Sequence, residues 1–392
     1  MFYVYFMEEN IDFLLKLLSF NGNNFDYKPD IECVRFCSQE LEKLGFDCDF
    51  QIFEDVANLY AVLKKKDGKQ RKTLCFAGHC DVVIKGNGWN YNSCGEVAGN
   101  RIYGRGAVDM LGGVACFLSA IKKVITEKPN ILDDINLSVL LTGDEENECI
   151  NGTTKMVDYL LQKGESFDYC ILGEPSTKDS KNIDNDKLSG IRTKRGGSLL
   201  FRIKIKGIVA HVANIQEFDN PVQRCVNLCQ QLKQLSFVDK MTNLEILGID
   251  AKNKSVNVIL DEAEIFGNVR FFQETGEQVI EKIKKVCNDI CADCYTISTI
   301  IEREGYETDE NSAFIKMAMN IMKDYNEKSD FNISRGVSDG EYIKRICPIV
   351  CELGLKGKLA HQPNEYTTKQ DMVDLQYLYE EIMLGTSKLL DK

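Results

Sequence analysis

The stretch NLSVLLTGDEENE, from Asn136 to Glu148, decides how the first half of the chain is built. Its first six residues, NLSVLL, are mostly apolar and predict a buried β-strand. Three adjacent carboxylates then follow at Asp144, Glu145 and Glu146. Adjacent like charges repel, and Asp and Glu are poor strand formers, so the strand should end there. A solvated loop is the ordinary interpretation of such a triplet. A bound cation is the alternative, and the other strand ends must decide between them.

The totals describe a folded globular protein. With 392 residues the chain is longer than one hydrophobic core usually supports, so two domains are expected. The formal net charge of −12 argues against nucleic acid or an anionic membrane surface as a partner. The N-terminal stretch MFYVYFMEENIDFLLKLLSF is interrupted by charges and fits neither a signal peptide nor a membrane span. It predicts an amphipathic helix over about residues 8–20.

Sixteen cysteines are scattered along the chain. In a long chain without a secretion signal they predict reduced thiols and a cytoplasmic location rather than a disulfide framework. Cys287, Cys291 and Cys294 come closest to a cluster, and their spacing places them on one face of a helix. One CxxC pair alone is weak support for zinc, so we expect a buried helix face there.

Strand-like and helix-like segments alternate through the first half of the chain. We expect strands in FQIFEDV, NLYAVL and TLCFAGH between about residues 50 and 79, and again in INLSVLL and FDYCILGE. Helices are expected over about 109–127 and 151–163. This alternation is typical of an α/β sheet with helices packed on its faces.

The pattern changes at about residue 197. SLLFRIKIKG, SVNVIL, EIFGNVRFF and YTISTII are expected as strands, and helices over about 220–236 and 275–294. Two helices and four strands of this kind predict a small α+β domain with a ferredoxin-like fold. After about residue 310 helices and strands alternate again. We therefore expect a discontinuous larger domain over 1–196 and 310–392, with the small domain, 197–309, inserted into it.

One expected strand ends in FAGHCDVV, which carries a candidate ligand. Side chains alternate along a strand, so His79 and Asp81 should point the same way and Cys80 the opposite way. A neutral imidazole can bind zinc, and a carboxylate can orient it. For this motif alone, a capped loop histidine is an equally good interpretation.

The segment YGRGAVDMLGGV surrounds Asp109 with glycines just before a predicted helix. Glycines there permit tight backbone geometry and close approach. Asp109 could instead cap the helix. A phosphate-binding loop is not expected, because the GxGxxG order and the P-loop lysine are both missing.

Two more segments complete the set of candidates. CILGEPS ends an apolar strand with Glu174, and LAHQPNE places His361 in a late polar loop. Strand ends are where α/β sheets bind ligands. Two histidines and three or four carboxylates suit two metal ions with nitrogen and oxygen ligands, either zinc or else cobalt or manganese. A two-metal site also needs a base for the water, and the adjacent Glu145 and Glu146 could divide these tasks.

Seven segments, in this order and spacing, resemble one known family: GHCDVV, GRGAVDMLGG, TGDEE, LGEPS, KRGGS, KGIVAHVA and AHQPNE. They resemble the co-catalytic zinc metallopeptidases and deacylases, which include aminoacylase and acetylornithine deacetylase, over about residues 8–390. The resemblance implies a zinc-peptidase-like catalytic domain with an inserted ferredoxin-like lid domain. It also implies that the lid is the dimerisation domain of a homodimer and that the substrate is a small N-acylated amino acid.

The resemblance implies five ligands for two zinc ions, with cobalt or manganese possible in one site. His79 and Glu174 would bind one ion. Glu146 and His361 would bind the other, and Asp109 would bridge both.

Three catalytic residues are implied beside these ligands. Asp81 would orient His79, and Glu145 would take a proton from the attacking water and return it to the leaving amine. His211 lies in the lid and would reach the active site across the dimer to help hold the oxyanion.

Five further positions match substrate contacts of the family: Arg195, Asn257, Arg270, Gly336 and Ser338. Arginine suits carboxylates because its planar fork binds both oxygens. Ordinary surface ion pairs remain an alternative for the two arginines. Ser338 and the backbone around Gly336 would bind the succinyl or carboxylate end of the substrate.

Within the family, KGIVAHVANIQEFDNPV, SVNVI, NVRF and GVSDGEYI resemble one branch more than the others. That branch removes succinate from an N-succinylated diamino acid in lysine and diaminopimelate biosynthesis. Ile84, Val337 and Gly357 stand where the family usually has Pro, Thr and Asn. The alternative is therefore a deacylase or dipeptidase that acts on another N-acyl amino acid or dipeptide. A catalytically silent, metal-stabilised binding dimer is a further alternative, against which the intact Glu145 argues.

Overall fold

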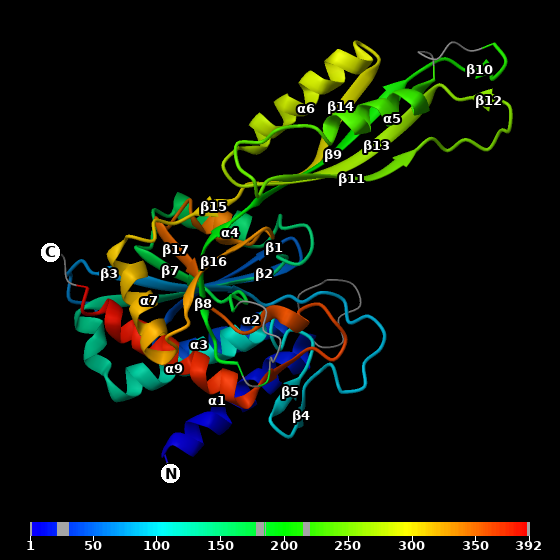
Figure 1. Cartoon of the computed structure of the whole chain (residues 1–392). Coiled ribbons are helices and arrows are strands. Elements are labelled where there is room, and N and C mark those ends of the chain that lie inside the picture. The colour runs from blue at the N-terminus through cyan, green and yellow to red at the C-terminus, as the bar shows by residue number, and fades with distance from the viewer. Residues whose placement is uncertain (1, 22–30, 178–183, 185, 215–219, 390–392) are drawn as a thin grey trace. The chain divides into compact units, whose positions relative to one another are not determined.

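The computed structural model of the chain divides into two compact units (Figure 1). The described residues are 2–21, 31–177, 184, 186–214 and 220–389. The first unit comprises Met1–Lys194, Glu307–Asn332 and Ser338–Lys392, and the second comprises Arg195–Tyr306 and Ile333–Val337. Nothing in the sequence predicted that the short segment Ile333–Val337 belongs to the second unit.

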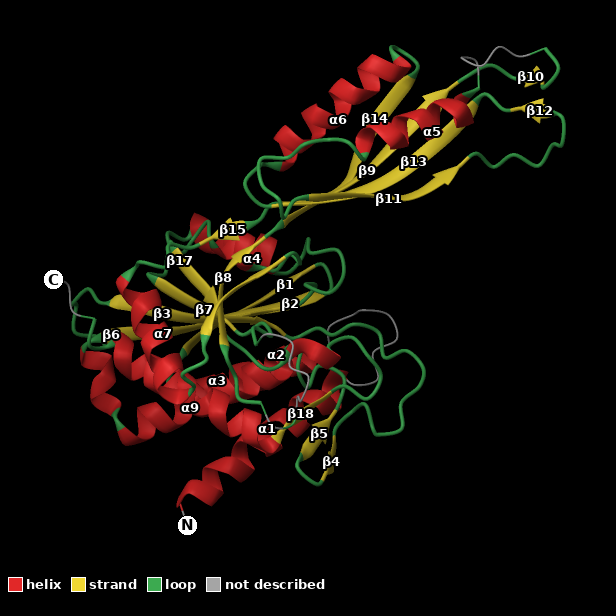
Figure 2. Cartoon of the chain, in the orientation of Figure 1, coloured by secondary structure: helices red, strands yellow, loops and turns green. Residues whose placement is uncertain are grey.

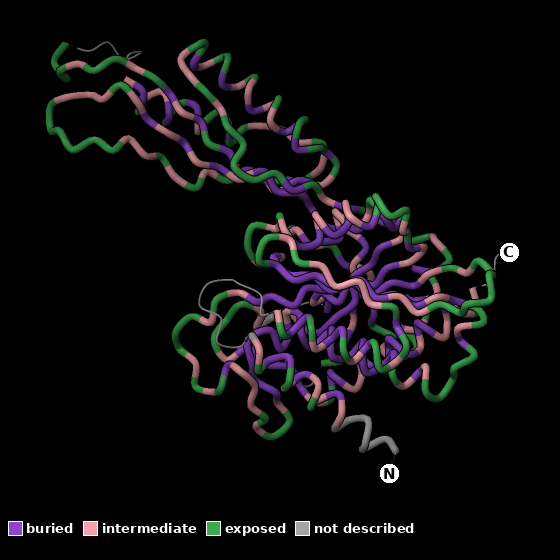
Figure 3. The backbone as a smooth tube through the Cα atoms, turned by 180° about the vertical axis from the view of Figure 1, so that it is seen from behind, coloured by how far each residue is buried: buried purple, intermediate pink, exposed green. Residues whose placement is uncertain are grey.

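A nine-stranded mixed sheet forms the centre of the first unit. Its order is β1-β2-β6-β3-β7-β17-β8-β15, with β16 also pairing with β8. The strands are β1 Asp47–Phe53, β2 Val56–Leu63, β3 Lys72–His79, β6 Ile135–Thr142, β7 Tyr169–Leu172, β8 Gly190–Arg195, β15 Tyr306–Glu307, β16 Asp330–Ser334 and β17 Ile349–Glu352. The central strands β6, β3, β7 and β17 run parallel to one another. Figure 3 shows that this sheet is largely buried, as the apolar runs in the sequence predict.

Helices cover both faces of this sheet (Figure 2). They are α1 Phe2–Asn21, α2 Ile31–Lys43, α3 Leu111–Glu127, α4 Thr153–Gln162, α7 Ala313–Tyr325, α8 Gly340–Ile343 and α9 Lys369–Thr386. Helix α1 begins earlier than the predicted helix at 8–20. A small three-stranded sheet, β18-β5-β4, is made by Tyr366–Thr368, Arg101–Tyr103 and Glu96–Ala98. No described helix is long and apolar enough to cross a membrane.

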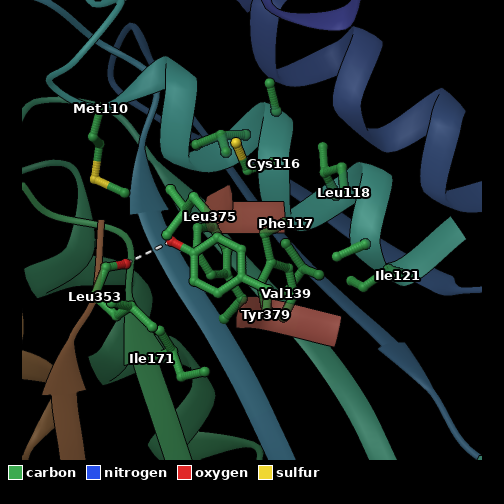
Figure 4. Close-up of a cluster of buried hydrophobic side chains, with 14 of the residues drawn as sticks. Met110, Cys116, Phe117, Leu118, Ile121, Val139, Ile171, Leu353, Leu375 and Tyr379 are labelled. Atoms are coloured by element: carbon green, nitrogen blue, oxygen red, sulfur yellow. Dashed lines mark hydrogen bonds between the residues drawn. The ribbon is translucent and has the colours of Figure 1, made fainter. Parts of the chain in front are cut away.

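The core beneath the sheet packs α3 against α9 (Figure 4). The rings of Phe76 and Phe117 stack with centroids 4.1 Å apart, and Tyr379 meets both rings edge-on. The Tyr379 hydroxyl donates to the carbonyl oxygen of Leu353 at 2.5 Å, which satisfies a buried polar group. Aromatic packing of this kind fixes α3, which begins at Leu111, two residues after Asp109.

The second unit is a four-stranded antiparallel sheet with two helices. The chain runs β9 Gly197–Lys206, α5 Pro221–Leu232, β11 Asn243–Asp250, β13 Glu262–Phe271, α6 Gly276–Cys291 and β14 Tyr295–Arg303. The sheet order is β11-β13-β9-β14. This βαββαβ arrangement is ferredoxin-like. Alternate residues of β9 are buried beneath the helices, and Thr275 begins α6 with a capping box.

One predicted strand of this unit is wrong. SVNVIL is not part of the four-stranded sheet: only β12, Val258–Ile259, is extended, and it pairs with the short β10, Ala210–His211. The fourth strand is β11, formed by NLEILGID. As an edge strand β11 buries little beyond Leu244, so its apolar pattern is weak. Val256, in the apolar-looking SVNVIL, is 99% exposed.

Most of the cysteines are buried and pack in the protein interior. All sixteen are free thiols. Cys287 and Cys291 lie on the buried face of α6, as the spacing predicted, but Cys294 lies beyond the end of this helix and is only partly buried. Burial raises the pKa of the Cys287 thiol to about 12, which is the behaviour of an inert structural cysteine.

Candidate metal centre

The parallel strands β3, β6 and β7 bring three acidic or histidine-bearing loops to one edge of the sheet. His79 at the end of β3 is in register with Thr142 at the end of β6, and Ala77 with Leu172 at the end of β7. The loops that carry Glu145 and Glu174 therefore begin beside His79. Carboxyl ends of parallel strands are the usual ligand-binding edge of such a sheet.

His79 lies at the centre of this edge and is 1% exposed. Its Nε2 atom lies 3.5 Å from Asp109 Oδ1 and 3.5 Å from Glu174 Oε1. No described residue makes a hydrogen bond to this nitrogen. The other ring nitrogen, Nδ1, lies 2.9 Å from the carbonyl oxygen of Asp81 and 3.6 Å from its carboxylate. Asp81 thus orients the ring, and the free nitrogen faces two carboxylates.

His361 approaches the same cluster from a distant part of the chain. Its Nε2 atom lies 2.9 Å from Glu146 Oε1 and 3.2 Å from Asp109 Oδ2. Asp109 therefore presents one carboxylate oxygen to each histidine. The structure brings together all five predicted ligands.

The spacing of these atoms fits a divalent cation. Two ligands of a tetrahedral zinc ion lie about 3.4 Å apart when each bond is about 2.0–2.1 Å long. The 3.5 Å separations around His79 Nε2 match this value. The ligand atoms of His79, Glu145 and Glu174 lie within 4.8 Å of one another, and so do those of His79, Asp109 and Glu146. An unpartnered buried nitrogen amid carboxylates is the donor set that zinc, cobalt or manganese prefers.

The pKa values of the cluster show an unbalanced charge. Burial lowers the pKa of His79, but the carboxylates of Asp109 and Glu174 outweigh it and raise that pKa well above its usual value. Asp109 and Glu146 raise the pKa of His361 to about 10. Burial and the neighbouring Glu174 raise the pKa of Glu145 well above its usual value. Each shift favours an added proton, and a divalent cation would supply the same positive charge.

The three acidic residues after β6 make different contacts. Asp144 has a φ of 65°, and its carboxylate accepts from the backbone amides of Ile150 and Asn151 at 2.9 Å each. This ties the loop into a fixed turn, as Asp side chains often do. Glu145 and Glu146 then reach the metal centre, and the Glu146 amide donates to Asp81 at 2.9 Å. Sequence reasoning assigned no role to Asp144, although Asp at a tight turn is the signal for one.

Glycines around Asp109 are required by close packing. Gly106 has a φ of 89°, where residues with a side chain are strained. A Cβ atom on Gly113 would lie 2.7 Å from the carbonyl oxygen of Gly173, the residue before Glu174. The first turn of α3 thus rests on the loop that carries another ligand.

The predicted substrate residues fall into separate groups. In the second unit, the Nε2 atom of His211 lies 3.4 Å from the Nδ2 atom of Asn257, and both side chains are exposed. Arg195 is 8% exposed and donates to the carbonyl oxygens of Val337 at 3.2 Å and Gly336 at 3.5 Å.

Arg270 and Ser338 differ in what they contact. Burial lowers the pKa of the half-buried Arg270, and no described residue pairs with its guanidinium. In the first unit, Ser338 is 1% exposed and donates to Glu352 at 2.7 Å.

Residues 75–385 match the model of a family described as Peptidase family M20/M25/M40. The chain belongs to this family, and its class is that of a metal-dependent amide hydrolase.

Two curated relatives of the chain carry the same name. Succinyl-diaminopimelate desuccinylase of Rickettsia bellii (strain OSU 85-389) is 34% identical over 372 residues, which cover 90% of this chain and 91% of the relative. The protein of the same name from Rickettsia rickettsii (strain Sheila Smith) is 32% identical over 395 residues, covering 95% and 99%.

Solved structures share the fold. Aminopeptidase PepT from Bacillus cereus ATCC 10987 superposes with a TM-score of 0.80 at 18% identity, covering 97% of this chain and 99% of that one. The YXEP protein of Bacillus subtilis, a dinuclear metal binding peptidase from the M20 family, superposes with a TM-score of 0.72 at 16% identity, covering 97% and 98%.

Proposed function

We propose that this chain removes succinate from N-succinyl-LL-2,6-diaminopimelate in lysine and diaminopimelate biosynthesis. The observation that carries the proposal is the placement of Asp109 between His79 and His361, with Glu174 and Glu146 on the two sides. The choice of substrate is supported by the named relatives, which match nine-tenths or more of the chain.

The five residues of this cluster would hold two metal ions, and we propose zinc for both, with cobalt or manganese as a substitute in one. His79 and Glu174 would hold one ion and Glu146 and His361 the other, with Asp109 shared. Bound there, the ions would polarise the amide carbonyl and lower the pKa of a water molecule.

Glu145 is the proposed general base and acid. Its carboxylate lies with His79 and Glu174 in one of the two candidate ligand groups, yet the other five residues already suffice as ligands. It is therefore free to take a proton from the attacking water and return it to the leaving amine. Glu145 is partly buried, which limits the access of bulk water to this exchange.

The second unit supplies most of the proposed substrate contacts, and the first unit supplies Ser338. Arg270 is a half-buried cation without a described partner, which suits a substrate carboxylate. Arg195, Asn257, the backbone at Gly336 and Ser338 are proposed to bind other parts of the substrate. We propose a cytoplasmic homodimer in which His211 helps hold the oxyanion of the other protomer's site.

The deciding experiment is hydrolysis of N-succinyl-LL-2,6-diaminopimelate by protein reconstituted with zinc, beside a chelated sample. Metal-dependent release of succinate is the expected result. No release with two zinc ions bound per chain would reject this substrate. Failure on every amide tested, with both metals bound, would favour a silent binding dimer instead.

A second candidate is a deacylase or dipeptidase for another N-acyl amino acid or dipeptide. Gly357 favours it, because a Cβ atom there would lie 3.0 Å from Pro175, directly after Glu174. The family's usual Asn would crowd that contact, so Pro175 or the loop would have to shift to accept it. A panel of acyl amino acids and dipeptides, compared by kcat/KM, separates the two candidates.

A further inference from the structure

A buried ion pair, Arg105 with Glu365, lies behind the metal centre in the first unit. Arg105 is 2% exposed and Glu365 is fully buried. The Arg105 guanidinium donates to Glu365 Oε2 at 2.7 Å. Burying two charges is expensive, so a pair that contacts no solvent calls for a reason.

Glu365 holds the backbone that leads into Asp109. Its Oε1 atom accepts from the amide of Val108 at 2.8 Å and from the amide of Asp109 itself at 3.2 Å. Its own carbonyl oxygen accepts from the amide of Gly104 at 3.0 Å. Glu365 thus fixes the segment just before the bridging carboxylate.

Arg105 holds the loop that carries His361. Its guanidinium donates to the carbonyl oxygens of His361 and Gln362 at 3.3 Å each. It also donates to the carbonyl oxygen of Lys85, in the loop that follows His79, at 3.2 Å. His361 has a φ of 67°, a conformation that a histidine seldom adopts without outside support.

We propose that Arg105 and Glu365 are positioning residues that set the distance between Asp109 and His361, and so the affinity of the metal site that these two share with Glu146. One ion pair joins the loop that follows His79, the segment before Asp109 and the loop that carries His361. Among the described hydrogen bonds, none joins the side chain of Arg105 or Glu365 to a proposed ligand atom. The inference rests on the proposed metal centre, and it concerns one of the two sites.

The test is a stepwise titration of metal-free protein with Co²⁺, followed by absorption spectroscopy and calorimetry. In Glu365→Gln the amide keeps one acceptor and turns an NH₂ group toward either Arg105 or the backbone amides of Val108 and Asp109. We expect one of the two ions to bind about 10–100-fold more weakly, with the other little changed. His361→Ala should lose the same site, which identifies it.

Glu380→Gln is the matched control. Glu380 is also buried, and its two oxygens accept from Lys123 at 2.7 Å and from the Gln376 amide at 3.0 Å, between α3 and α9. It should bind both ions as the wild type does. Equal weakening in the control, or unchanged binding in Glu365→Gln, overturns the inference.

A second variant keeps the test decisive if Glu365→Gln does not fold. Arg105→Lys keeps the positive charge but loses the fork that spans Glu365 and the His361 carbonyl. The same selective loss is expected, and wild-type binding of both ions would reject the inference. Wild-type protein that fails to bind two ions would instead reject the proposed metal centre.

Discussion

The residues proposed for chemistry lie in two different settings. In the first unit, His79 is 1% exposed and its partners come from strand ends fixed by the core. In the second unit, His211 at the end of β10 and Asn257 just before β12 are both exposed. In the first setting, all five proposed metal ligands come from one chain. In the second setting, His211 and Asn257 contact each other at 3.4 Å and remain exposed, and their proposed role requires a substrate or a second copy of the chain.

Among the substitutions that test this comparison, Glu145→Gln in the first unit has the largest expected effect. We expect turnover to fall by about 10²–10⁴-fold, because the amide cannot accept the proton of the attacking water. Metal content should stay at the wild-type value, since the five ligands remain. Turnover and metal analysis on the same preparation check this. Retained turnover would exclude Glu145 as the base.

His211→Ala is the counterpart in the second unit. Removal of one oxyanion donor is expected to lower kcat by about 10²–10³-fold. Both ions should still bind, because His211 is not a ligand. Mixing this variant with Glu145→Gln sharpens the comparison: in a homodimer with shared sites, mixed dimers should recover part of the activity. No recovery after subunit exchange would argue against a shared site.

Much of the metal centre could be predicted from sequence because its signals are local. Strands β3, β6 and β7 are short apolar runs; β3 ends in His79, and an acid stands two positions after the end of β6 and of β7. Parallel pairing then forces those residues to one edge. Such a pattern can be recognised in the sequence without knowledge of contacts between distant parts of the chain.

What the sequence did not reveal depends on distant or weak signals. The hydrogen bond from Arg105 to Glu365 joins residues 260 positions apart, and no periodic pattern in the sequence predicts it. The role of Asp144 follows from a loop conformation rather than from its neighbours' polarity. Strand β11 was missed because an edge strand buries only one side in part.

The pH dependence of metal binding tests the first unit alone. His361, whose pKa is raised to about 10 by Asp109 and Glu146, carries a proton at neutral pH and must lose it to become a ligand. Apparent affinity should therefore rise with pH below about 10, by about tenfold per pH unit for each proton released. Calorimetry in buffers of different ionisation enthalpy counts those protons. Affinity independent of pH between 6 and 8 would contradict the charge balance described for the cluster.

Arg270→Ala tests the second unit with the smallest expected effect. The guanidinium is half-buried and unpaired among the described residues, so a substrate carboxylate is its natural partner. KM should rise about tenfold, the equivalent of one charged hydrogen bond, while metal binding stays unchanged. Arg202→Ala is the control, because Arg202 lies on the adjacent strand β9 and already faces Glu264 at 3.7 Å. Equal effects of the two substitutions would mean that Arg270 acts only through the general charge of the sheet. A rise in KM confined to Arg270, and absent for substrate analogues that lack the carboxylate, would assign it to that group.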